Sequence, residues 1–476
     1  MGRSTPIRLA QARLPEIERG GIPVPRYDRA RLEPGIVHVG VGGFHRAHLA
    51  VYVHELASRG SAWGIVGLGL LEADAEMAAT LGGQDCLYTL IEKGGGEPSA
   101  QIIGSITGFV HAPGGQDGAA TELIAAPSTS ILSLTITESG YSEPPDAAPA
   151  GAEPTTFDRI AAALALRRER SLGALTILSC DNVPQNGDAA RAATLSAVGR
   201  LDGDLYQWVE SHCRFPNSMV DRITPATASD DRDWLRDSAG IVDGWPVVSE
   251  PFRQWVMEDD FAGERPAWED AGALFSDRIH DWEQYKLRML NAGHSSIAYL
   301  SALAGITYVH EAMAVPAVRS FLEGLLYEEA IPTLVEIPGH PREDYAASVL
   351  ERFANAGVRD QIARLCLDGS AKFATFLMPT IERQLEGGGP VDQAATALAG
   401  WARYLAVVDP AEQAFDPAGD VARSYAAAAA ADPEAFLEYE AVFTPAVRSA
   451  PRFRTAFNAG YERIVVDGPI AAMGAA

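Results

Sequence analysis

A short apolar run followed at once by closely spaced glycines sets the strongest limit on what this chain can fold into. Residues 35–39 (GIVHV) have the apolar, β-branched character of a buried strand, and residues 40–43 (GVGG) form the loop behind it. The apolar pattern through Leu56 then has helical spacing. Strand, glycine loop and helix in this order are typical of an α/β unit that binds a dinucleotide, because glycines let a pyrophosphate approach the helix N-terminus.

The glycine motif is incomplete, so two interpretations remain open. Gly40 and Gly42 fit the first two glycines of the common pattern, but His45 stands where the third would be. A Gly-x-Gly pair also occurs in purely structural turns. His45 and His48 have the spacing of a helical metal-binding pair, yet no third ligand is evident in the sequence, and two structural histidines are the simpler interpretation.

Apolar stretches that read as buried strands recur along the first half of the chain. They cover residues 63–71, 87–91, 131–137 and 175–180, and residues 245–256 form a further strand-like stretch. In open α/β sheets, ligands bind beyond the carboxyl ends of the strands. Polar residues that directly follow these stretches are therefore candidate site residues.

Asp74 and Asn182 occupy two such positions. Asp74 follows the second strand, where an acid can accept hydrogen bonds from an adenosine ribose and repel a 2′-phosphate. It lies 34 positions after Gly40, which is later than the usual spacing, and a helix-capping role is the alternative. Asn182 follows the stretch 175–180, and its alternative is an ordinary Asp-Asn turn.

A second cluster of polar residues lies on a predicted helix further along the chain. With Lys286 set at zero on an α-helical wheel, Asn291 falls near about 140°, His294 near about 80° and Glu283 near about 60°. The four side chains therefore share one side of the helix and could supply a proton-transfer group, an amide and an imidazole to one small space. A solvated polar face is the alternative, although Lys is rare on buried faces unless it is paired or functional.

From residue 283 onward the pattern is mostly helical, with few strand candidates. Residues 387–390 (GGGP) separate two predicted helices. Arg364 and Lys372 are basic residues in this acidic half, and they lie on either side of residues 368–370.

Composition excludes several classes of function. With 38 Lys and Arg against 63 Asp and Glu, the formal net charge of −25 opposes binding to nucleic acid or to an anionic membrane. No apolar run is long enough to span a bilayer, and the N-terminus lacks the apolar core of a signal peptide. The four cysteines lie far apart in the sequence, which favours free thiols in a cytoplasmic protein over a disulfide framework or a metal site.

Taken together, the motifs resemble those of the polyol-specific long-chain dehydrogenase/reductase family, which is typified by mannitol 2-dehydrogenase. The matching segments are GVGGFHRAH (40–48), SLTITESGY (133–141), SCDNVPQNG (179–187), FPNSMVDRITP (215–225), ERPAW (264–268), KLRMLNAGH (286–294) and DGSAKF (368–373). They are spread over most of the chain in the expected order, which makes the resemblance far more specific than the glycine loop alone.

The resemblance implies an α/β fold in which a Rossmann-type N-terminal domain (1–282) is followed by a mainly α-helical C-terminal domain (283–476) that carries substrate-binding and catalytic residues. It implies an active site between the two domains and no metal. The cofactor NAD would be held by the glycine loop and by the acid after the second strand, through Gly40, Gly42, Gly43, Phe44 and Asp74. Ala73 precedes Asp74 where relatives also have an acid, and Glu72 lies nearby instead, so the strictness of the NAD preference stays open.

By the same resemblance, Lys286 is the general acid/base, and Asn182 and Asn291 hold the reacting oxygen. Glu283 exchanges protons between Lys286 and solvent, and His294 contacts the polyol. Further substrate contacts come from Asp221, Arg364 and Lys372. This chemistry is consistent, because without zinc a side-chain base must remove the hydroxyl proton, and a lysine can do so when burial lowers its pKa toward neutrality.

The sequence therefore predicts a cytoplasmic, NAD-dependent oxidoreductase that interconverts a sugar alcohol and a 2-ketose. D-mannitol and D-fructose are the leading pair, D-arabinitol and sorbitol are further candidates, and a monomer is consistent with the family. One alternative is a hexuronate reductase of the same family, acting on fructuronate or tagaturonate, which would need an additional basic contact. Another is a non-catalytic dinucleotide-binding sensor, which would have no need for the set of Lys286, Asn291 and His294.

Overall fold

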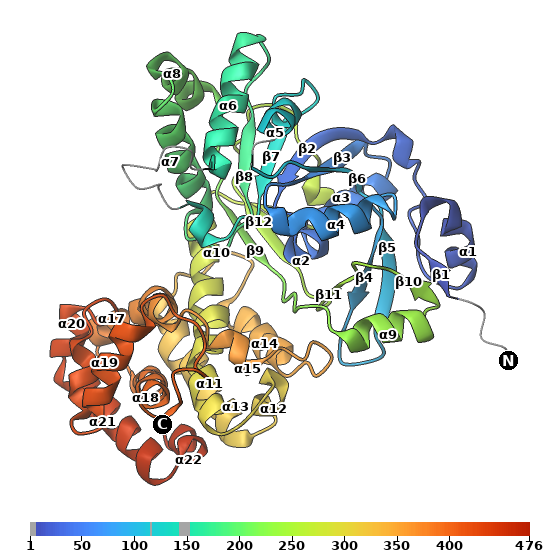
Figure 1. The fold of residues 1–476 in the computed structure, drawn as a ribbon. Helices are drawn as coiled ribbons and strands as arrows, with labels where there is room; N and C mark the ends of the chain where they lie inside the picture. The colour runs from blue at the N-terminus through green and yellow to red at the C-terminus, as the bar shows by residue number, and fades with distance from the viewer. Residues whose placement is uncertain (1–5, 115–116, 142–152) are drawn as a thin grey trace. The chain divides into compact units, whose positions relative to one another are not determined.

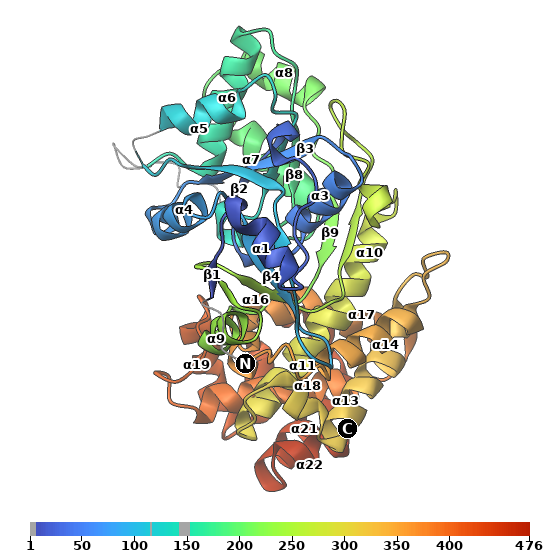
Figure 2. The same cartoon turned by 90° about the vertical axis from the view of Figure 1, so that its right-hand side faces the viewer.

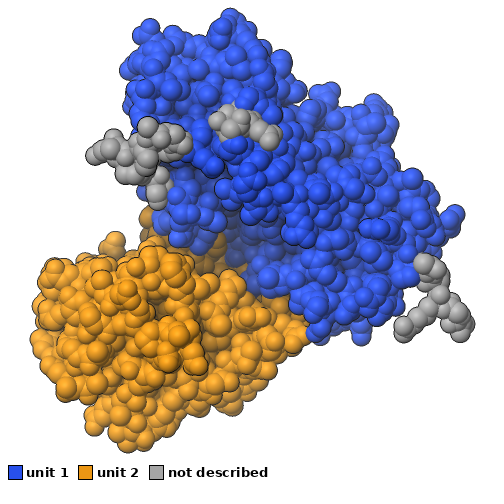
Figure 3. All heavy atoms as spheres, viewed as in Figure 1, with its two compact units in different colours: residues 1–279 blue, residues 280–476 orange. Residues whose placement is uncertain are grey.

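The computed structural model describes residues 6–114, 117–141 and 153–476. The chain forms two compact units, Met1–Ile279 (unit 1) and His280–Ala476 (unit 2), which Figure 3 shows in different colours. Unit 1 combines sheets and helices, whereas the described secondary structure of unit 2 is helical (Figure 1).

Unit 1 is built around a five-stranded parallel sheet with the strand order β6-β3-β2-β7-β8. Its strands are β2 (Glu33–Val39), β3 (Trp63–Gly69), β6 (Ile106–His111), β7 (Ile131–Leu134) and β8 (Thr176–Ser179). The chain therefore starts in the middle of the sheet, builds outward to one edge, and then returns to build the other half. This is the doubly wound order of dinucleotide-binding sheets, and its switch point lies between β2 and β7.

Helices cover both faces of this sheet, which explains why its strands are almost continuously apolar. Ile36 on β2 packs with the helices that follow the glycine loop, whereas its neighbours Val37 and Val39 point into a second core on the opposite face. The helices of unit 1 around the sheet are α2 (Gly43–Ala47), α3 (Leu49–Ser58), α4 (Ala75–Gly82), α5 (Asp117–Ile124), α6 (Thr156–Glu169), α7 (Asn186–Gly199) and α8 (Gly203–His212).

Smaller sheets complete unit 1. Their strands are β1 (Ile7–Arg8) with β10 (Ile241–Val242); β11 (Val247–Ser249), β4 (Tyr88–Glu92) and β5 (Ser99–Ile103); and β13 (Leu274–Phe275), β12 (Gln254–Met257) and β9 (Ser218–Asp221). The N-terminal helix α1 (Leu14–Arg19) buries Leu14 and Ile17 in one core cluster with Leu87 and Ile91. Helix α9 (Ser229–Asp237) contacts β10, and Figure 2 shows α1 and α9 in unit 1.

The predicted fold class is confirmed, but several strands differ from the prediction. The strand-like stretch 245–256 forms two strands, β11 and β12, which belong to separate sheets. The predicted strand 87–91 exists as β4, but it belongs to a separate sheet, and the third strand of the main sheet is β6, which the sequence pattern did not single out. The predicted strand 131–137 ends at Leu134. The strand ends there because the chain turns: Thr135 donates its hydroxyl to the Gly40 carbonyl, and Thr137 has a positive φ of 65°.

Unit 2 is a bundle of helices around the long helices α11, α18 and α21 (Figure 1). Its helices are α10 (Ile279–Tyr285), α11 (Ala292–Leu303), α12 (Val309–Met313), α13 (Pro316–Gly324), α14 (Arg342–Phe353), α15 (Ile362–Leu365), α16 (Gly369–Lys372), α17 (Met378–Gly387), α18 (Asp392–Val407), α19 (Gly419–Ala429), α20 (Pro445–Ser449), α21 (Pro451–Val466) and α22 (Pro469–Gly474). The predicted helix break is confirmed, since α17 ends at Gly387 and Gly388 has a φ of 72°.

Three segments of unit 2 are π-helical: η6 (Lys286–Asn291), η7 (Leu325–Ala330) and η9 (Phe373–Leu377). Because π-helical turns are rare and concentrate at functional sites, their presence marks this unit for closer inspection. Within the described ranges, no helix has both the length and the apolar character needed to cross a bilayer.

A buried carboxylate in η7 joins two helices of this bundle. Glu329 is fully buried and accepts hydrogen bonds from the backbone N–H groups of Gln393 (2.8 Å) and Ala394 (3.0 Å) in the first turn of α18. Burial raises the pKa of Glu329 to about 8, although the two N–H donors favour the charged form and act in the opposite direction.

Replacing Glu329 by Gln should therefore change how stability depends on pH. A carboxyl whose folded pKa is raised contributes stability that is present below its unfolded pKa, near 4.5, and is lost as the pH rises through about 8. Glu329→Gln should be less stable than the wild type at pH 5, where its amide N–H₂ opposes a backbone donor, and this deficit should shrink by pH 9. Thermal unfolding at both pH values measures the difference, and a deficit that grows with pH would contradict the assignment.

Candidate functional site

The conformation of the glycine loop in unit 1 depends on the close approach of Gly40 to the carbonyl of Thr135. Gly40 has a φ of 85°, and a Cβ atom there would lie 2.1 Å from the carbonyl oxygen of Thr135, so no other residue fits. At Gly42, in contrast, the nearest atom to such a Cβ is 3.9 Å away. The loop thus presents bare backbone directly before the N-terminus of α2, which is the arrangement that a pyrophosphate needs.

The histidines around this loop pack against one another. The ring of His45 stacks on His38 of β2 at a centroid distance of 3.4 Å, and both rings are buried. Burial lowers the pKa of His38 to about 3 and that of His45 well below its usual value, so both are neutral. His48 donates from Nε2 to the carbonyl oxygen of Gln254 at 3.0 Å. His45, in the third glycine position, therefore fills the space between strand and helix.

This packing favours the structural interpretation of His45 and His48. In residues 6–114, 117–141 and 153–476, no group of three or more His, Cys, Asp or Glu side chains is placed to hold a metal ion.

Asp74 lies just beyond β3, in the 3₁₀ turn η3 (Glu72–Asp74). Its Oδ2 accepts a hydrogen bond from the backbone N–H of Leu71 at 3.0 Å, as the capping interpretation expected. Its Oδ1 has no hydrogen-bond partner in the described part of the chain, and the side chain is half-buried. Gly69 makes room for it, because a Cβ atom there would lie 2.8 Å from the Cβ of Asp74. Asp74 can therefore cap its turn and still present one oxygen to a ligand.

Asn182 lies in an exposed position at the carboxyl end of β8, in a loop held from both sides. The adjacent carboxylate of Asp181 accepts hydrogen bonds from the backbone N–H groups of Ile136 (3.0 Å) and Thr137 (2.8 Å) and from the hydroxyl of Tyr141 (2.7 Å). These bonds join the loops after β7 and β8, next to the switch point of the sheet. Asn182 thus lies just beyond the carboxyl end of β8, and its role at a ligand stays a prediction.

Asp221 is the last residue of β9 and is buried. It belongs to the separate sheet with β12, where it lies opposite Gln254. The next residue, Arg222, donates to the carbonyl oxygen of Glu250 at 3.0 Å, to that of Ala47 at the end of α2, and to the carboxylate of Glu92. The hydrogen bonds of Arg222 therefore fix the end of β9, with Asp221, beside α2.

In unit 2, the segment from Ile279 to Leu303 is helical throughout, as predicted, but its middle part is π-helical. The N–H of Ala292 bonds to the carbonyl of Leu287, which is an i→i+5 contact. The α-helical angles predicted from the sequence therefore do not hold across residues 286–291. The wider turn places Asn291 about one turn from Lys286, closer to the same face than a regular α-helix would.

The amide of Asn291 lies at the end of this π-helical segment. Its Nδ2 is buried and has no hydrogen-bond partner among the residues that the structure describes. Most buried polar groups in folded proteins are paired, and Asn291 is one of several described residues here with a buried side-chain atom that is not. Asn291 follows Lys286 in the same π-helical turn, and Lys286 is half-buried.

Arg288 anchors this turn to the rest of unit 2. Its guanidinium is buried and donates from Nε to the hydroxyl of Thr380 on α17 (3.0 Å) and from a terminal nitrogen to the hydroxyl of Thr333. Burial, together with the charge of Arg383, lowers the pKa of Arg288 to about 10, so it stays charged near neutral pH. One turn before Lys286, Glu283 is buried, with Oε2 at 3.9 Å from the Nδ1 of His280.

His294 and Arg364 meet at a carboxylate that the sequence did not single out. Asp360 accepts two hydrogen bonds from Arg364, and its Oδ2 lies 3.8 Å from the Nε2 of His294. The ring of His294 also stacks on Phe353 at a centroid distance of 3.9 Å. Burial lowers the pKa of His294 to about 3 despite the opposing effect of Asp360, so the imidazole is neutral.

Lys372 is held by the short helix α16. Its amine donates to the carbonyl oxygen of Leu365 at 3.2 Å. At the start of α16, Ser370 donates from its backbone N–H and its hydroxyl to Asp416, both at 2.8 Å. Gly369 is required there, because a Cβ atom would lie 2.1 Å from the hydroxyl of Tyr299. The structure thus brings Lys286, Asn291, His294, Arg364 and Lys372 into one unit and explains how several of them are held.

Comparisons with known proteins decide the family. Residues 34–270 match the mannitol dehydrogenase Rossmann domain, and residues 278–465 match the mannitol dehydrogenase C-terminal domain. The chain belongs to the mannitol dehydrogenase family. Among relatives, it is 40% identical to mannitol dehydrogenase 2 of Saccharomyces cerevisiae (95% of this chain, 94% of the relative). It is also 40% identical to mannitol 2-dehydrogenase of Aspergillus terreus (97% and 98%).

Two solved structures are similar over almost the whole chain. The ternary complex of Pseudomonas fluorescens mannitol 2-dehydrogenase with NAD and D-mannitol has a TM-score of 0.87 at 36% identity and covers 98% of this chain and 99% of that one. D-sorbitol dehydrogenase in substrate-free form has a TM-score of 0.88 at 32% identity and covers 98% and 100%. The resemblance that the sequence motifs indicated is thereby confirmed for this mannitol dehydrogenase family member.

Two glycine substitutions separate the structural and the ligand-binding parts of the loop. Gly40→Ala should destabilise the fold, since the left-handed backbone alone costs about 1–3 kcal/mol and the Thr135 carbonyl must also move. Gly42→Ala should leave the unfolding temperature nearly unchanged but weaken NADH binding on the order of tenfold, because its methyl group would hinder phosphate contacts to the backbone. Thermal unfolding and fluorescence titration with NADH measure both, and unchanged NADH affinity in Gly42→Ala would contradict this view of the loop.

Proposed function

We propose that this chain is an NAD-dependent polyol dehydrogenase that interconverts D-mannitol and D-fructose. The observation that carries the proposal is the buried, unpartnered amide of Asn291 in the same π-helical turn as Lys286. A reacting substrate oxygen would supply the missing acceptor. Family membership and the similarity to a mannitol 2-dehydrogenase that binds NAD and D-mannitol support this choice.

The residues of unit 1 fit an adenine dinucleotide. The bare backbone at Gly42, with Gly40, Gly43 and Phe44, would hold the pyrophosphate, and the second oxygen of Asp74 would accept a hydrogen bond from the ribose. When bound, the nicotinamide supplies the acceptor or donor of a hydride. The protein groups must then bind, orient and exchange protons with the substrate.

Lys286 is proposed to move the proton. In alcohol oxidation its neutral amine accepts the hydroxyl proton, and in ketone reduction its charged form returns it. Asn291 and Asn182 donate hydrogen bonds to the substrate oxygen as it gains negative charge, and amide donors do this without adding a charge of their own. Glu283 lies one turn before Lys286 and passes the proton toward solvent, on the side where its carboxylate lies 3.9 Å from His280.

The substrate hydroxyls are assigned to polar residues of both units. We propose that Asp221 contributes from unit 1, and that His294, Arg364 and Lys372 contribute from unit 2. His294 is neutral and therefore both donates and accepts hydrogen bonds, which suits a hydroxyl group. D-arabinitol and sorbitol present the same chemistry and remain candidate substrates.

The sequence-based domain division at residues 282 and 283, the cytoplasmic location and the monomeric state also stay proposals. Cys86, Cys180, Cys213 and Cys366 are all buried and free, which supports a reducing compartment. Size-exclusion chromatography with light scattering would determine the oligomeric state.

A spectrophotometric panel of sugar alcohols with NAD, and of ketoses with NADH, tests the function. The proposal expects D-mannitol and D-fructose to have the highest specificity constants. A purified, folded chain that oxidises no polyol and reduces no ketose would contradict it and would favour a non-catalytic nucleotide-binding role.

The role of Lys286 predicts opposite pH dependences in the two directions. Oxidation needs the neutral amine and should rise with pH through the titration of Lys286, whereas reduction needs the charged form and should fall over the same range. Lys286→Ala should lower kcat by about 10²–10⁴-fold, the usual scale for a lost general acid/base. NADH affinity serves as the control and should hardly change. Near-normal turnover in the variant would move the proton-transfer role to another group.

Cofactor choice is tested by comparing two neighbouring acids. Asp74→Ala should weaken the preference for NADH over NADPH, because the repulsion of the 2′-phosphate and the hydrogen bond to the ribose are both lost. Glu72→Ala is the matched control, since Glu72 is exposed in the same turn. If Glu72→Ala relaxed the preference and Asp74→Ala did not, the selecting acid would be Glu72.

A further inference from the structure

The carboxylate of Asp360 connects two residues that the proposed function assigns to the substrate. Arg364 donates to it from Nε (2.8 Å, to Oδ1) and from a terminal nitrogen (2.5 Å, to Oδ2). The same Oδ2 lies 3.8 Å from the Nε2 of His294. The Asp360 side chain is only 6% exposed, whereas that of Arg364 is 50% exposed. The carboxylate is thus hidden behind a guanidinium that remains accessible.

This pair is a fixed ion pair. Burial alone would raise the pKa of Asp360, but the hydrogen bonds and the charge of Arg364 outweigh burial and hold that pKa below its usual value. Asp360 is therefore charged at neutral pH, and the two-point geometry is the strong, oriented form of an arginine–carboxylate contact. The positive charge of Arg364 is compensated before any substrate binds.

In this pair, Arg364 can still donate hydrogen bonds to a substrate, but its positive charge is largely compensated by Asp360. A guanidinium has five N–H donors, and Asp360 takes two of them, on Nε and on one terminal nitrogen, which is one of the two-point geometries that a substrate carboxylate could use. The remaining donors can still bind hydroxyl oxygens. Arg364, Arg352 and Lys372 lower the pKa of His294, and Asp360 acts on that pKa in the opposite direction.

We propose that Asp360 is a specificity-determining residue that restricts the substrate to uncharged polyols and ketoses. By occupying Arg364, it excludes the carboxylate of a hexuronate from this subsite. The inference rests on the proposed function and refines it, since the same family site without this compensation would have a basic contact for an anionic substrate. Asp360 acts through Arg364 and His294, so it is a positioning residue and not a catalytic one.

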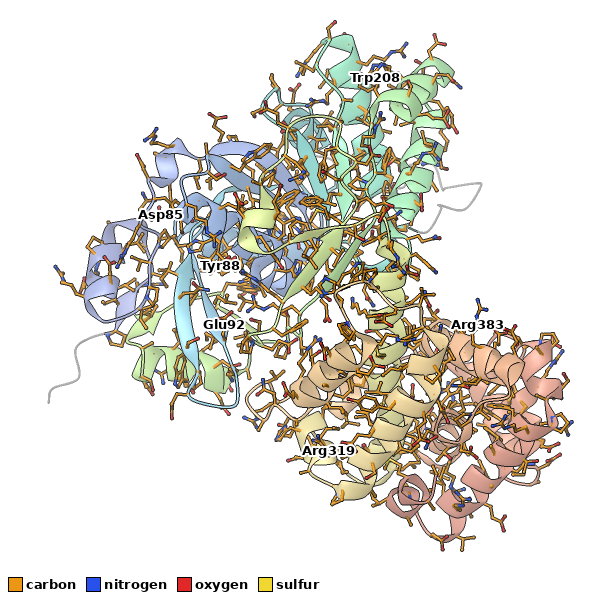
Figure 4. All side chains as sticks on the ribbon, turned by 180° about the vertical axis from the view of Figure 1, so that it is seen from behind. Asp85, Tyr88, Glu92, Trp208, Arg319 and Arg383 are labelled. Carbon is orange, nitrogen blue, oxygen red and sulfur yellow. The ribbon has the colours of Figure 1, made fainter. Side chains whose placement is uncertain are left out.

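A purely structural role for Asp360 makes a different prediction. The pair spans four residues, and such ion pairs commonly support local structure alone. In that case, loss of the charge would lower the activity on all substrates equally. A matched pair of the same spacing is Arg319 with Glu323 on α13, on the surface of unit 2, where Figure 4 labels Arg319.

The test compares Asp360→Asn with Glu323→Gln and the wild type. For each, kcat/KM is measured with NADH for D-fructose and for the hexuronates fructuronate and tagaturonate. Asp360→Asn should raise the ratio of hexuronate to fructose activity by at least about tenfold, because an uncompensated Arg364 attracts the carboxylate. Glu323→Gln should keep the wild-type ratio. An unchanged ratio in Asp360→Asn, with both activities reduced alike, would overturn the proposal.

A measurement on the wild type keeps the proposal testable even if Asp360→Asn does not fold. Hexuronates should inhibit fructose reduction only weakly, with an inhibition constant at least about tenfold above the KM for fructose. Equal values would overturn the role of Asp360. A wild-type enzyme that turns over no polyol or ketose would instead contradict the proposed function itself, so the two failures can be told apart.

Discussion

The i→i+5 hydrogen bond between Ala292 and Leu287 is the constraint on which the candidate site of unit 2 depends. It widens the helix between Lys286 and Asn291, and so it changes the directions in which these two side chains point. π-helical turns are energetically unfavourable and persist where surrounding contacts hold them. Here Arg288 provides such contacts, because its guanidinium reaches Thr333 and Thr380 on neighbouring segments. The amide of Asn291, which is buried and has no hydrogen-bond partner among the described residues, lies at the end of this turn.

Unit 1 depends on a comparable constraint at the switch point of its sheet. The close approach of Gly40 to the Thr135 carbonyl fastens the loop after β2 to the loop after β7. Asp181 fastens the loop after β8 to that same segment through the backbone of Ile136 and Thr137. The loops after β2, β7 and β8 are therefore fixed to one another. This gives the glycine loop and Asn182 defined positions at the carboxyl edge of the sheet.

Much of this fold could be predicted from local sequence patterns. Buried parallel strands are apolar on both faces, so β2, β3 and β8 were visible as short apolar runs, and the helical half was visible from its spacing. β6 (ITGFVH) was missed because its pattern is less apolar and it has a glycine in the middle. The sheet to which β4 belongs could not be predicted either, since strand pairing depends on contacts between residues far apart in the chain.

The site shows the same division between local and distant information. Lys286, Asn291 and His294 were predicted as site residues from their types, their spacing and the family resemblance. The π-helical turn was not predicted, because no local signal distinguishes it from an α-helix. Asp360 was overlooked although its spacing to Arg364 is the one signal that could have revealed it. Its importance appears only when the fold brings His294, from a segment far earlier in the chain, to the same carboxylate.

We propose that one turn of helix presents both a proton-transfer group and an oxyanion donor to the same substrate atom. A crystal structure of the protein with NAD and D-mannitol would test this most directly. We predict that the reacting hydroxyl oxygen lies within hydrogen-bond distance, about 2.6–3.2 Å, of both the Lys286 Nζ and the Asn291 Nδ2, with η6 still π-helical. A polyol bound with Asn291 still unpartnered, or with its reacting oxygen out of reach of Lys286, would contradict it.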